Sequence, residues 1–507
     1  MKAKKQLKAK SNHKTGSSAS KKRSVASKAQ QREEQMRRVN PHAGGIDCGA
    51  REHYVAVPPE SVEPGEPCVR CFSAFTEGLD ILVEWLKACG VTTAAMESTG
   101  VYWIPLYQKL EAAGIEVYLV NARHVRHVPG RKSDVQDCQW LQQLHSWGLL
   151  SASFRPEDMI CRLRSLQRHR ANMISVAASE IQHMQKALQQ MNLHLHHVVS
   201  DINGVSGLRI IDAILAGERD PKILAKLRDY RIRKSTPARM EAALVGDYRA
   251  EHLFVLGQGL QAYRFYQAQM EVCDREIETV LNQLAQRFES ACDAEAGAPQ
   301  PEQAVQDPQR EHAVEAQTQR RVKEKRKRKP RANEPKIDLC AYLERICGVD
   351  LTQVVGLNVM SVLLIVSEIG VDMSKWRSAK AFCSWLGLCP GNKISGGKVL
   401  DSRTRKVINR VATALRLAAQ AAGRSNNTCL GIFYRRKKAH LGPAKATTAT
   451  ARKLACIVYH LLKYKDQYRE PDPATYQLKL HNATLNKLQK QAAIIGYQLV
   501  PSPLVAR

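Results

Sequence analysis

The stretch HAGGIDCGAREHYVAV, residues 42–57, decides the fold of the first part of the chain. Its two apolar runs, His42 to Asp47 and His53 to Val57, have the length of β-strands, and Gly49-Ala50 between them favours a turn. A third such run, Cys68 to Thr76, follows a loop that contains several prolines. Three successive strands with these connections predict an antiparallel meander.

Alternating helical and strand patterns follow the meander. We expect a helix around Leu79 to Leu86, a strand from Val91 to Met96, a helix from Ile104 to Ala113, a strand from Ile115 to Val120 and a helix from about Asp134 to Trp147. The order β-β-β-α-β-α-β-α is the ribonuclease H arrangement. The fold class predicted for this part of the chain is therefore α/β and ribonuclease H-like.

Four acidic residues occupy the places where such a sheet gathers carboxylates. Asp47 closes the first predicted strand and Glu97 the fourth, so pairing of these strands brings both to one edge of the sheet. Asp134 and Asp137 share a face of the helix whose expected N-cap is Ser133. Like charges in one cluster are costly unless a cation lies among them, and Mg²⁺ prefers oxygen ligands.

A pair of such ions activates both sides of a phosphoryl displacement, which points to phosphodiester chemistry on nucleic acid. The alternative for any one of these acids is a solvated surface residue or a helix cap.

The composition favours a nucleic-acid partner independently. Lys and Arg number 77 against 48 Asp and Glu, a formal net charge of +29, which attracts a polyphosphate. There is no apolar stretch of membrane-spanning length, and the basic N-terminus lacks the apolar segment of a secretory signal. We expect a protein that stays in the cytoplasm and binds nucleic acid.

Changes in composition along the chain predict its organisation. The expected segments are a disordered basic tail (1–40), the α/β domain (41–154), a helical region (155–289), a flexible basic linker (290–335), a mostly α-helical domain (336–470) and a C-terminal tail (471–507). Two long amphipathic patterns in the helical region indicate an antiparallel coiled-coil arm; the alternative is a plain helical bundle. The basic run Arg320 to Arg331 is interpreted as a solvated hinge or a nucleic-acid contact.

The last domain carries a second signal. Gly348 and Gly356 lie before the apolar helix Val359 to Ile369, an outline like a helix-hairpin-helix, whose glycines approach a phosphate backbone. Further on, Ser395 precedes two glycines in a loop, which would leave its hydroxyl uncrowded for nucleophilic attack. Taken alone, Ser-Gly-Gly is typical of an ordinary turn.

Basic side chains lie in and after the Ser395 loop, and one more precedes the helix expected from Asp134 to Trp147. The candidate nucleic-acid contacts are Lys132, Lys398, Arg403, Arg405, Lys406, Arg410, Arg435, Arg436, Lys437 and Lys438. The alternative for these residues is a solvated helix face. His194, His196 and His197 are interpreted as surface residues at a helix end rather than metal ligands.

Several motifs in register give the chain a family resemblance. They are Ile46-Asp47-Cys48-Gly49, Met96-Glu97-Ser98-Thr99-Gly100, Val120-Asn121-Ala122, Lys132-Ser133-Asp134-x-x-Asp137, Gly387-Leu-Cys-Pro390, Ser395-Gly396-Gly397-Lys398 and Ala451-Arg452-Lys453-Leu454-Ala455. In this order they resemble the bacterial insertion-sequence transposases of the IS110 family, from residue 42 to about residue 465. Two departures are Cys138, where the family often has Ala, and the segment Ser290 to Pro335, which is longer and more basic than typical.

The resemblance implies a RuvC-like N-terminal domain with a DEDD acidic set and a C-terminal transposase domain that supplies a serine. By that analogy Asp47, Glu97, Asp134 and Asp137 would bind Mg²⁺, and Ser395 would attack DNA and become transiently joined to it through a phosphoserine bond. It further implies a homo-oligomer, dimer or tetramer, acting on the element ends and the target DNA in the bacterial cytoplasm, associated with the nucleoid. Some members are guided by a non-coding bridge RNA, whose base pairing would supply sequence specificity.

Three functions are weighed. The favoured one is an RNA-guided DNA transposase, or site-specific recombinase, that uses the acidic quartet and Ser395. The second is a RuvC-like metal-dependent DNA nuclease without a serine intermediate. The third is a non-catalytic nucleic-acid-binding regulator.

Overall fold

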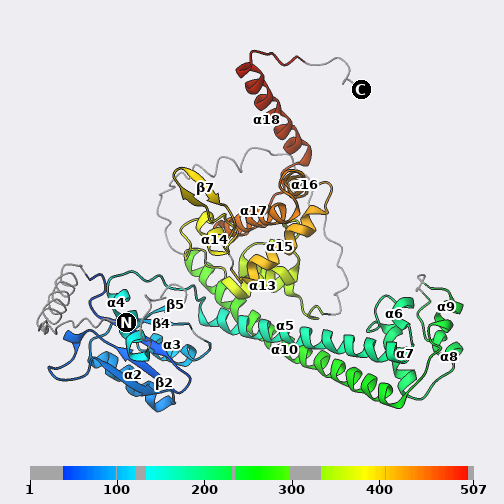
Figure 1. Cartoon of the computed structure of the whole chain (residues 1–507), viewed down its shortest axis with the longest axis horizontal. Helices are drawn as coiled ribbons and strands as arrows, with labels where there is room; N and C mark the ends of the chain where they lie inside the picture. The colour runs from blue at the N-terminus through cyan, green and yellow to red at the C-terminus, as the bar shows by residue number, and fades with distance from the viewer. Residues whose placement is uncertain are drawn as a thin grey trace, which may run out of the picture. The chain divides into compact units, whose positions relative to one another are not determined.

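The structure is a computed structural model that describes residues 38–98, 100–121, 133–230, 235–296, 333–405 and 407–500. It divides into two compact units, Met1–Arg155 and Pro156–Arg507 (Figure 1). Some sequence predictions lie outside the described residues. They concern most of the tail 1–40, most of the linker 290–335 with its run Arg320 to Arg331, and the candidate contacts Lys132 and Lys406.

The first unit is built on a five-stranded sheet of order β3-β2-β1-β4-β5. Its strands are β1 (Ala43–Cys48), β2 (Glu52–Ala56), β3 (Val69–Ser73), β4 (Thr93–Glu97) and β5 (Glu116–Val120). The first three form the antiparallel meander, and β1, β4 and β5 run parallel. The predicted ribonuclease H-like order is confirmed, with strand ends shifted by one to three residues.

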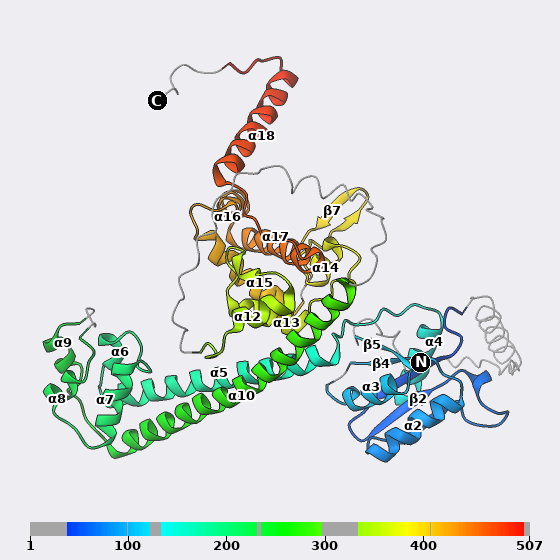
Figure 2. The ribbon, with the colours of Figure 1, turned by 180° about the vertical axis from the view of Figure 1, so that it is seen from behind.

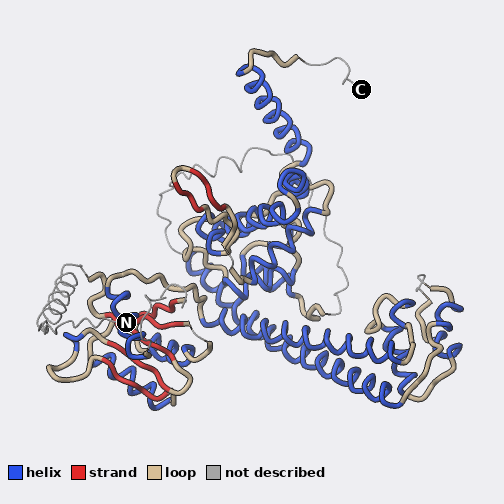
Figure 3. Tube along the Cα trace, in the orientation of Figure 1, coloured by secondary structure: helices blue, strands red, loops and turns tan. Residues whose placement is uncertain are grey.

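Helices cover both faces of this sheet. The helices α2 (Thr76–Ala88) and α3 (Trp103–Ala112) pack on one face, over a core that includes Leu82, Met96 and Leu106. Helix α4 (Asp134–Ser146) lies on the opposite face, where Leu141 contacts Val120. Figure 3 shows the strands, drawn in red, between these helices. A sheet covered on both faces explains why β1 and β4 are almost wholly buried.

The second unit begins with a pair of long helices, α5 (Asp158–Gln190) and α10 (Ala250–Ala296). Arg162 at the start of α5 lies 3.5 Å from Gln283 near the end of α10, while Met184 meets Gly259 near the start of α10. The helices are therefore antiparallel, as the two amphipathic patterns predict, and we call the pair the arm (Figure 2).

Four short helices lie at the end of the arm: α6 (Leu195–Val198), α7 (Val205–Leu215), α8 (Pro221–Lys226) and α9 (Pro237–Ala242). Their apolar side chains share one core with the end of α5 and the start of α10. Figure 2 shows these short helices gathered where α5 ends and α10 begins. We call this cluster the arm tip.

A buried ion pair joins the arm helices. The guanidinium of Arg170 donates two hydrogen bonds to the carboxylate of Asp274, one of them at 3.1 Å, and a third to the carbonyl of Asn333 at 3.0 Å. The side chains of Arg170 and Asp274 are 3% and 11% exposed, so the two charges compensate each other away from water.

A mostly helical domain completes the second unit. Its elements are α12 (Leu339–Cys347), η2 (Leu351–Gln353), α13 (Val359–Ile369), α14 (Ala379–Trp385), β6 (Lys393–Ser395), β7 (Lys398–Asp401), α15 (Arg410–Gly423), α16 (Cys429–Leu441), α17 (Pro443–Tyr464) and α18 (Pro473–Ile494). Glu368 on α13 fastens this domain to the arm, because its carboxylate accepts paired hydrogen bonds of 2.9 and 2.7 Å from Arg168 on α5.

The glycines of the predicted helix-hairpin-helix face protein. A Cβ added to Gly356 would lie 2.3 Å from the carbonyl oxygen of Ala418 on α15, and one added to Gly348 would meet the side chain of Lys465 at 3.2 Å. Both have positive φ, so they allow sharp turns between α12 and α13. The helical outline is as predicted, but these glycines serve helix packing rather than an open backbone surface.

No helix in the described part of the chain is both long and apolar enough to cross a lipid bilayer.

The arm ion pair leads to a stability prediction. Asp274→Ala leaves the Arg170 guanidinium buried without its counter-charge, so we expect a loss of about 3–5 kcal/mol in the free energy of unfolding of the second unit. Denaturant unfolding of the full chain, followed by circular dichroism, measures it.

The matched control is Asp212→Ala, which breaks the exposed pair between Asp212 and Arg264 (2.7 Å). It should cost less than about 1 kcal/mol. Equal losses for the two variants would contradict the prediction.

Candidate active site

Two acidic residues lie at the carboxyl ends of adjacent parallel strands. In the register of β1 and β4, Ile46 is opposite Met96, and Asp47 and Glu97 are the next residues along each strand. Both acids are half-buried. The sequence prediction that strand pairing brings Asp47 and Glu97 to one sheet edge therefore agrees with the strand register.

Helix α4 adds the other two acids. A Cβ added to Gly45 of β1 would lie 2.3 Å from both the carbonyl oxygen of Cys138 and the amide nitrogen of Gln142, so only glycine lets α4 cross the strand this closely. This role of Gly45 was missed from the sequence, although two consecutive glycines inside a strand are its signal. The contact sets the start of α4 beside the end of β1.

The start of α4 is capped as the sequence predicts. The hydroxyl of Ser133 accepts a hydrogen bond from the amide of Gln136 at 3.3 Å, and Asp134 and Asp137 fall in the first turn. The positive end of the helix dipole partly offsets these two negative charges. Asp134 is exposed and Asp137 half-buried.

Asp47 and Asp134 line the same hollow on the surface of the first unit. The turn between β1 and β2, with Tyr54 on β2, forms the rest of its wall. This turn is tight, because the amide of Gly49 donates to the carbonyl of Glu52 at 3.0 Å. The hollow is open to solvent and has room for a ligand beside both carboxylates.

The pKa values of two buried thiols are raised, in part by the negative charge of these acids. Burial, then the charges of Asp47 and Glu97, raise the pKa of Cys48 to about 12. Burial raises the pKa of Cys138 to about 12 as well, with further contributions from Asp47 and Asp137. Both thiols are therefore neutral at pH 7 and do not compete as anions for a cation.

The donor set fits a hard divalent cation. All four side chains offer carboxylate oxygens, the ligand type that Mg²⁺ selects. Among the described residues, the group whose ligand atoms all lie within 4.8 Å of one another is His194, His196 and His197, so the acids are spread more widely. We expect the quartet to close around cations and substrate rather than to stand preformed. We call these four acids the acidic edge.

Ser395 lies in the second unit at the tip of a β-hairpin. It ends β6 and pairs with Lys398, the first residue of β7, across Gly396 and Gly397, whose φ values are 53° and 74°. Two positive φ values give a tight two-residue hairpin turn. The sequence prediction placed Ser395 in a loop, whereas the structure places it at the end of a strand, and only the two glycines form the turn. Ile394 and Val399, which are typical strand residues, lie on either side of that turn.

The serine is uncrowded, as expected. Every residue from Lys393 to Lys398 is exposed, and a Cβ added to Gly396 or Gly397 would meet nothing within 4 Å. The hairpin therefore presents the Ser395 hydroxyl to solvent, with the Lys398 side chain directly across the strand pair.

The candidate nucleic-acid contacts differ in their surroundings. Arg403 is fully exposed, and Arg436 and Lys438 lie on the exposed side of α16. Arg405 donates to the carbonyl of Ser384, and Arg435 donates to the carbonyls of Ser425 (2.7 Å) and Asn426 (2.8 Å) after the end of α15. The last two guanidiniums thus already hold backbone in place; a role in binding nucleic acid stays a prediction for all of them.

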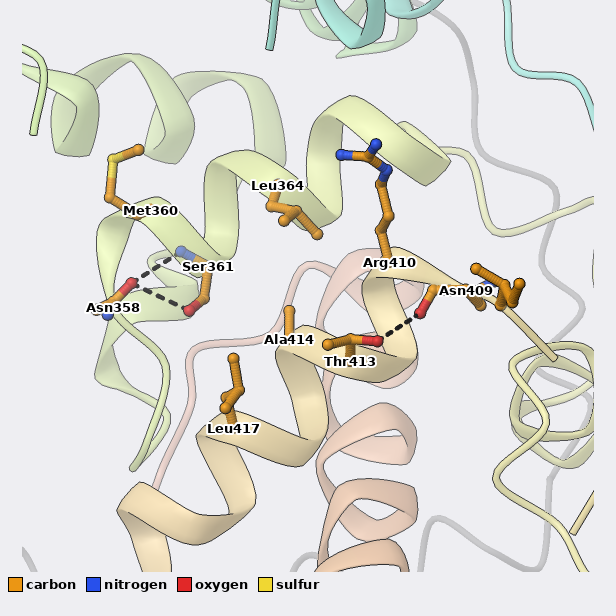
Figure 4. Close-up of a pocket in the computed structure, with 10 residues that line it drawn as sticks. Asn358, Met360, Ser361, Leu364, Asn409, Arg410, Thr413, Ala414 and Leu417 are labelled. Carbon is orange, nitrogen blue, oxygen red and sulfur yellow. Dashed lines mark hydrogen bonds between the residues drawn. The ribbon is translucent and has the colours of Figure 1, made fainter. Parts of the chain in front are cut away.

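A second hollow lies between α13 and α15 (Figure 4). Met360, Leu364 and Leu417 give it an apolar wall, and Arg410 at its rim lies 3.9 Å from Glu368. It contains neither the acidic edge nor Ser395, and no carboxylate lines it, so it lacks the cation ligand set expected for phosphodiester chemistry.

Comparison with protein families finds two matches. Residues 44–193 match the DEDD transposase domain of IS110 elements, and residues 350–435 match the transposases of the IS116/IS110/IS902 family. The first range contains the whole acidic edge and the second contains Ser395. No curated protein matches the chain.

Adjacent glycines in β1 provide a test of how the acidic edge is assembled. Gly45→Ala should push α4 away from the strand and lower the free energy of unfolding of the first unit by about 1–3 kcal/mol. Gly44→Ala is the control, because its Cβ would meet only side chains, the nearest at 3.3 Å. Thermal unfolding of the full chain compares the two. A Gly44→Ala loss as large as that of Gly45→Ala would contradict the assembly described.

Proposed function

The chain belongs to the IS110 family of transposases, and from this we propose that it excises and inserts a bacterial insertion sequence through one composite active site. In this proposal the acidic edge holds Mg²⁺, and Ser395 is the nucleophile that attacks DNA. The observation that carries the proposal is the pair of complementary features: carboxylates brought to one sheet edge by β1, β4 and α4, and a serine hydroxyl exposed at a hairpin tip.

The proposed attack by Ser395 is a transesterification, in which one phosphoester bond forms and another breaks. The Ser395 oxygen forms a bond to a phosphorus of the DNA backbone, and one bond from that phosphorus to a deoxyribose oxygen breaks. The serine loses its proton, and the departing deoxyribose oxygen gains one and leaves as a hydroxyl. Attack by a hydroxyl of another DNA strand reverses the step, so the strands are rejoined without an external energy source.

The chain's own residues supply orientation and charge. Lys398, across the strand pair from Ser395, is placed to attract the phosphate that the serine attacks. Arg403 and the exposed cations of α16 would bind backbone phosphates on either side. When bound, Mg²⁺ would neutralise the phosphate and polarise the bonds that change. Asp47, Glu97, Asp134 and Asp137 would hold it.

Sequence choice and assembly form the rest of the proposal. Phosphate contacts of this kind position DNA without reading its sequence, so we assign that task to a non-coding bridge RNA that pairs with donor and target DNA. We further propose a dimer or tetramer, since excision and insertion need several strands cut together.

The direct test supplies element-junction DNA, Mg²⁺ and the flanking non-coding RNA, and measures covalent protein–DNA adduct and recombined product. Ser395→Ala and Asp47→Asn should each lower adduct and product by roughly 1,000-fold or more, because each removes a group that acts on the reacting phosphate.

Neighbouring residues serve as controls. Ser402→Ala removes an exposed hydroxyl close to the hairpin, and Glu52→Gln alters another acid in the hollow that Asp47 lines. Both should keep most of the activity. If Ser395→Ala cuts DNA as well as the wild type does, a metal-dependent nuclease without a serine intermediate is the better reading. DNA binding without any cleavage would favour the non-catalytic regulator.

Mixing variants tests whether the composite site is shared between protomers. Asp47→Asn protein and Ser395→Ala protein are each inactive in this account. If an active site takes its acids from one protomer and its serine from another, the mixture should regain roughly a quarter to a half of wild-type recombination. A mixture as inactive as its parts would restrict the site to one protomer.

A further inference from the structure

Three histidines, none of them among the residues proposed for catalysis, gather at the arm tip. His194, His196 and His197 follow the end of α5, and their ligand nitrogens all lie within 4.8 Å of one another. The ring centroids of His196 and His197 are 4.1 Å apart, and those of His194 and His197 are 5.4 Å apart. The sequence interpretation treats these histidines as surface residues at a helix end, and His194 and His197 are indeed exposed, but the fold also brings the three rings together.

The backbone that carries them is held firmly. Asn192, with a φ of 58°, reverses the chain after α5, and the amide of His194 donates to the carbonyl of Ala243 at 2.9 Å. Leu195 and Val198, which alternate with the histidines, are buried in the arm-tip core. The three imidazoles are therefore displayed on an anchored turn, which limits the entropy lost when they converge on a ligand.

Neighbouring amides already orient two of the rings. The Nε2 of His194 lies 3.0 Å from the Oδ1 of Asn192, and the Nε2 of His196 lies 3.3 Å from the Nε2 of Gln189. A hydrogen-bond partner on one ring nitrogen commonly orients a metal-binding histidine and leaves its other nitrogen to bind the ion.

The other nitrogen of His196 lacks a partner in the described part of the chain. Its Nδ1 is buried and makes no hydrogen bond there. A buried polar atom in this state calls for a bound water or ion.

We propose that His194, His196 and His197 form a binding site for a divalent transition-metal ion of the Zn²⁺ class. Tetrahedral Zn²⁺ with three imidazole ligands needs nitrogens about 3.3 Å apart, which the exposed rings of His194 and His197 reach by side-chain rotation. The fourth position is left to water. The ion cross-links the turn between α5 and α6 and makes the arm tip more rigid.

The ligand chemistry separates this site from the acidic edge. Imidazole nitrogens select Zn²⁺, Co²⁺ or Ni²⁺, whereas carboxylates at the sheet edge suit Mg²⁺. If the histidines bind no metal ion, the proposed transposase chemistry is unaffected. If the transposase proposal fails, the histidine site can still bind its ion.

Co²⁺ titration of the full chain tests the proposal. In excess Mg²⁺ and a thiol-free reducing agent, the visible absorption of bound Co²⁺ should show about one histidine-ligated ion per chain, displaced by Zn²⁺ but not by Mg²⁺. The double variant His194→Gln/His197→Gln should lose it, with at least about a 100-fold weaker affinity.

Two histidines on α5 provide the control. His169→Gln/His183→Gln changes exposed residues on the arm and should bind Co²⁺ like the wild type. Circular dichroism confirms that each variant is folded. The proposal is overturned if the His194→Gln/His197→Gln protein binds as many ions as the wild type, or if the bound Co²⁺ shows only the strong near-ultraviolet absorption of thiolate ligands.

Discussion

The close approach of α4 to β1 at Gly45 is the contact on which the acidic edge depends. Two acids come from the ends of strands and two from the first turn of a helix, so they meet only if the helix crosses the strand at short distance. Because backbone atoms of Cys138 and Gln142 occupy the place of a Cβ, the absence of a side chain at Gly45 fixes that distance. The repulsion among the four carboxylates is then balanced in part by the helix dipole and, in the account given, by Mg²⁺.

The second unit relies on a different physical device. Long antiparallel helices are joined by the buried pair of Arg170 and Asp274, and Glu368 ties the arm to the C-terminal helices. Buried charges tolerate few alternative pairings, so they favour one register of the arm. The serine hairpin, by contrast, projects from this scaffold with all of its tip residues exposed. A helical base with an exposed tip suits the proposed role, in which the Ser395 hydroxyl must reach a DNA phosphate.

Much of the first unit could be predicted from local patterns. Apolar runs of strand length predicted β1 to β5, and Ser133 marked the start of α4 as a helix cap. Pairing of the first and fourth strands predicted that Asp47 and Glu97 share a sheet edge, whereas the contact of α4 with Gly45, which sets the place of Asp134 and Asp137, was missed. The roles that were missed depend on contacts between residues distant in sequence. Gly356 packs against α15, and Arg435 donates hydrogen bonds to backbone carbonyls. The arm-tip histidines lie at the surface, as expected from the sequence, but their proximity could not be predicted because it depends on a turn in the chain that helical periodicity does not show.

The central claim is that Ser395 becomes covalently joined to DNA during recombination. The most direct measurement is to trap the wild-type protein on element-junction DNA with Mg²⁺ and guide RNA, digest both polymers and locate the nucleotide-bearing peptide by mass spectrometry. The account predicts one modified site, Ser395, and no modified peptide when Mg²⁺ is withheld. A nucleotide on another residue, or recombined DNA with no modified peptide at any time point, would contradict it.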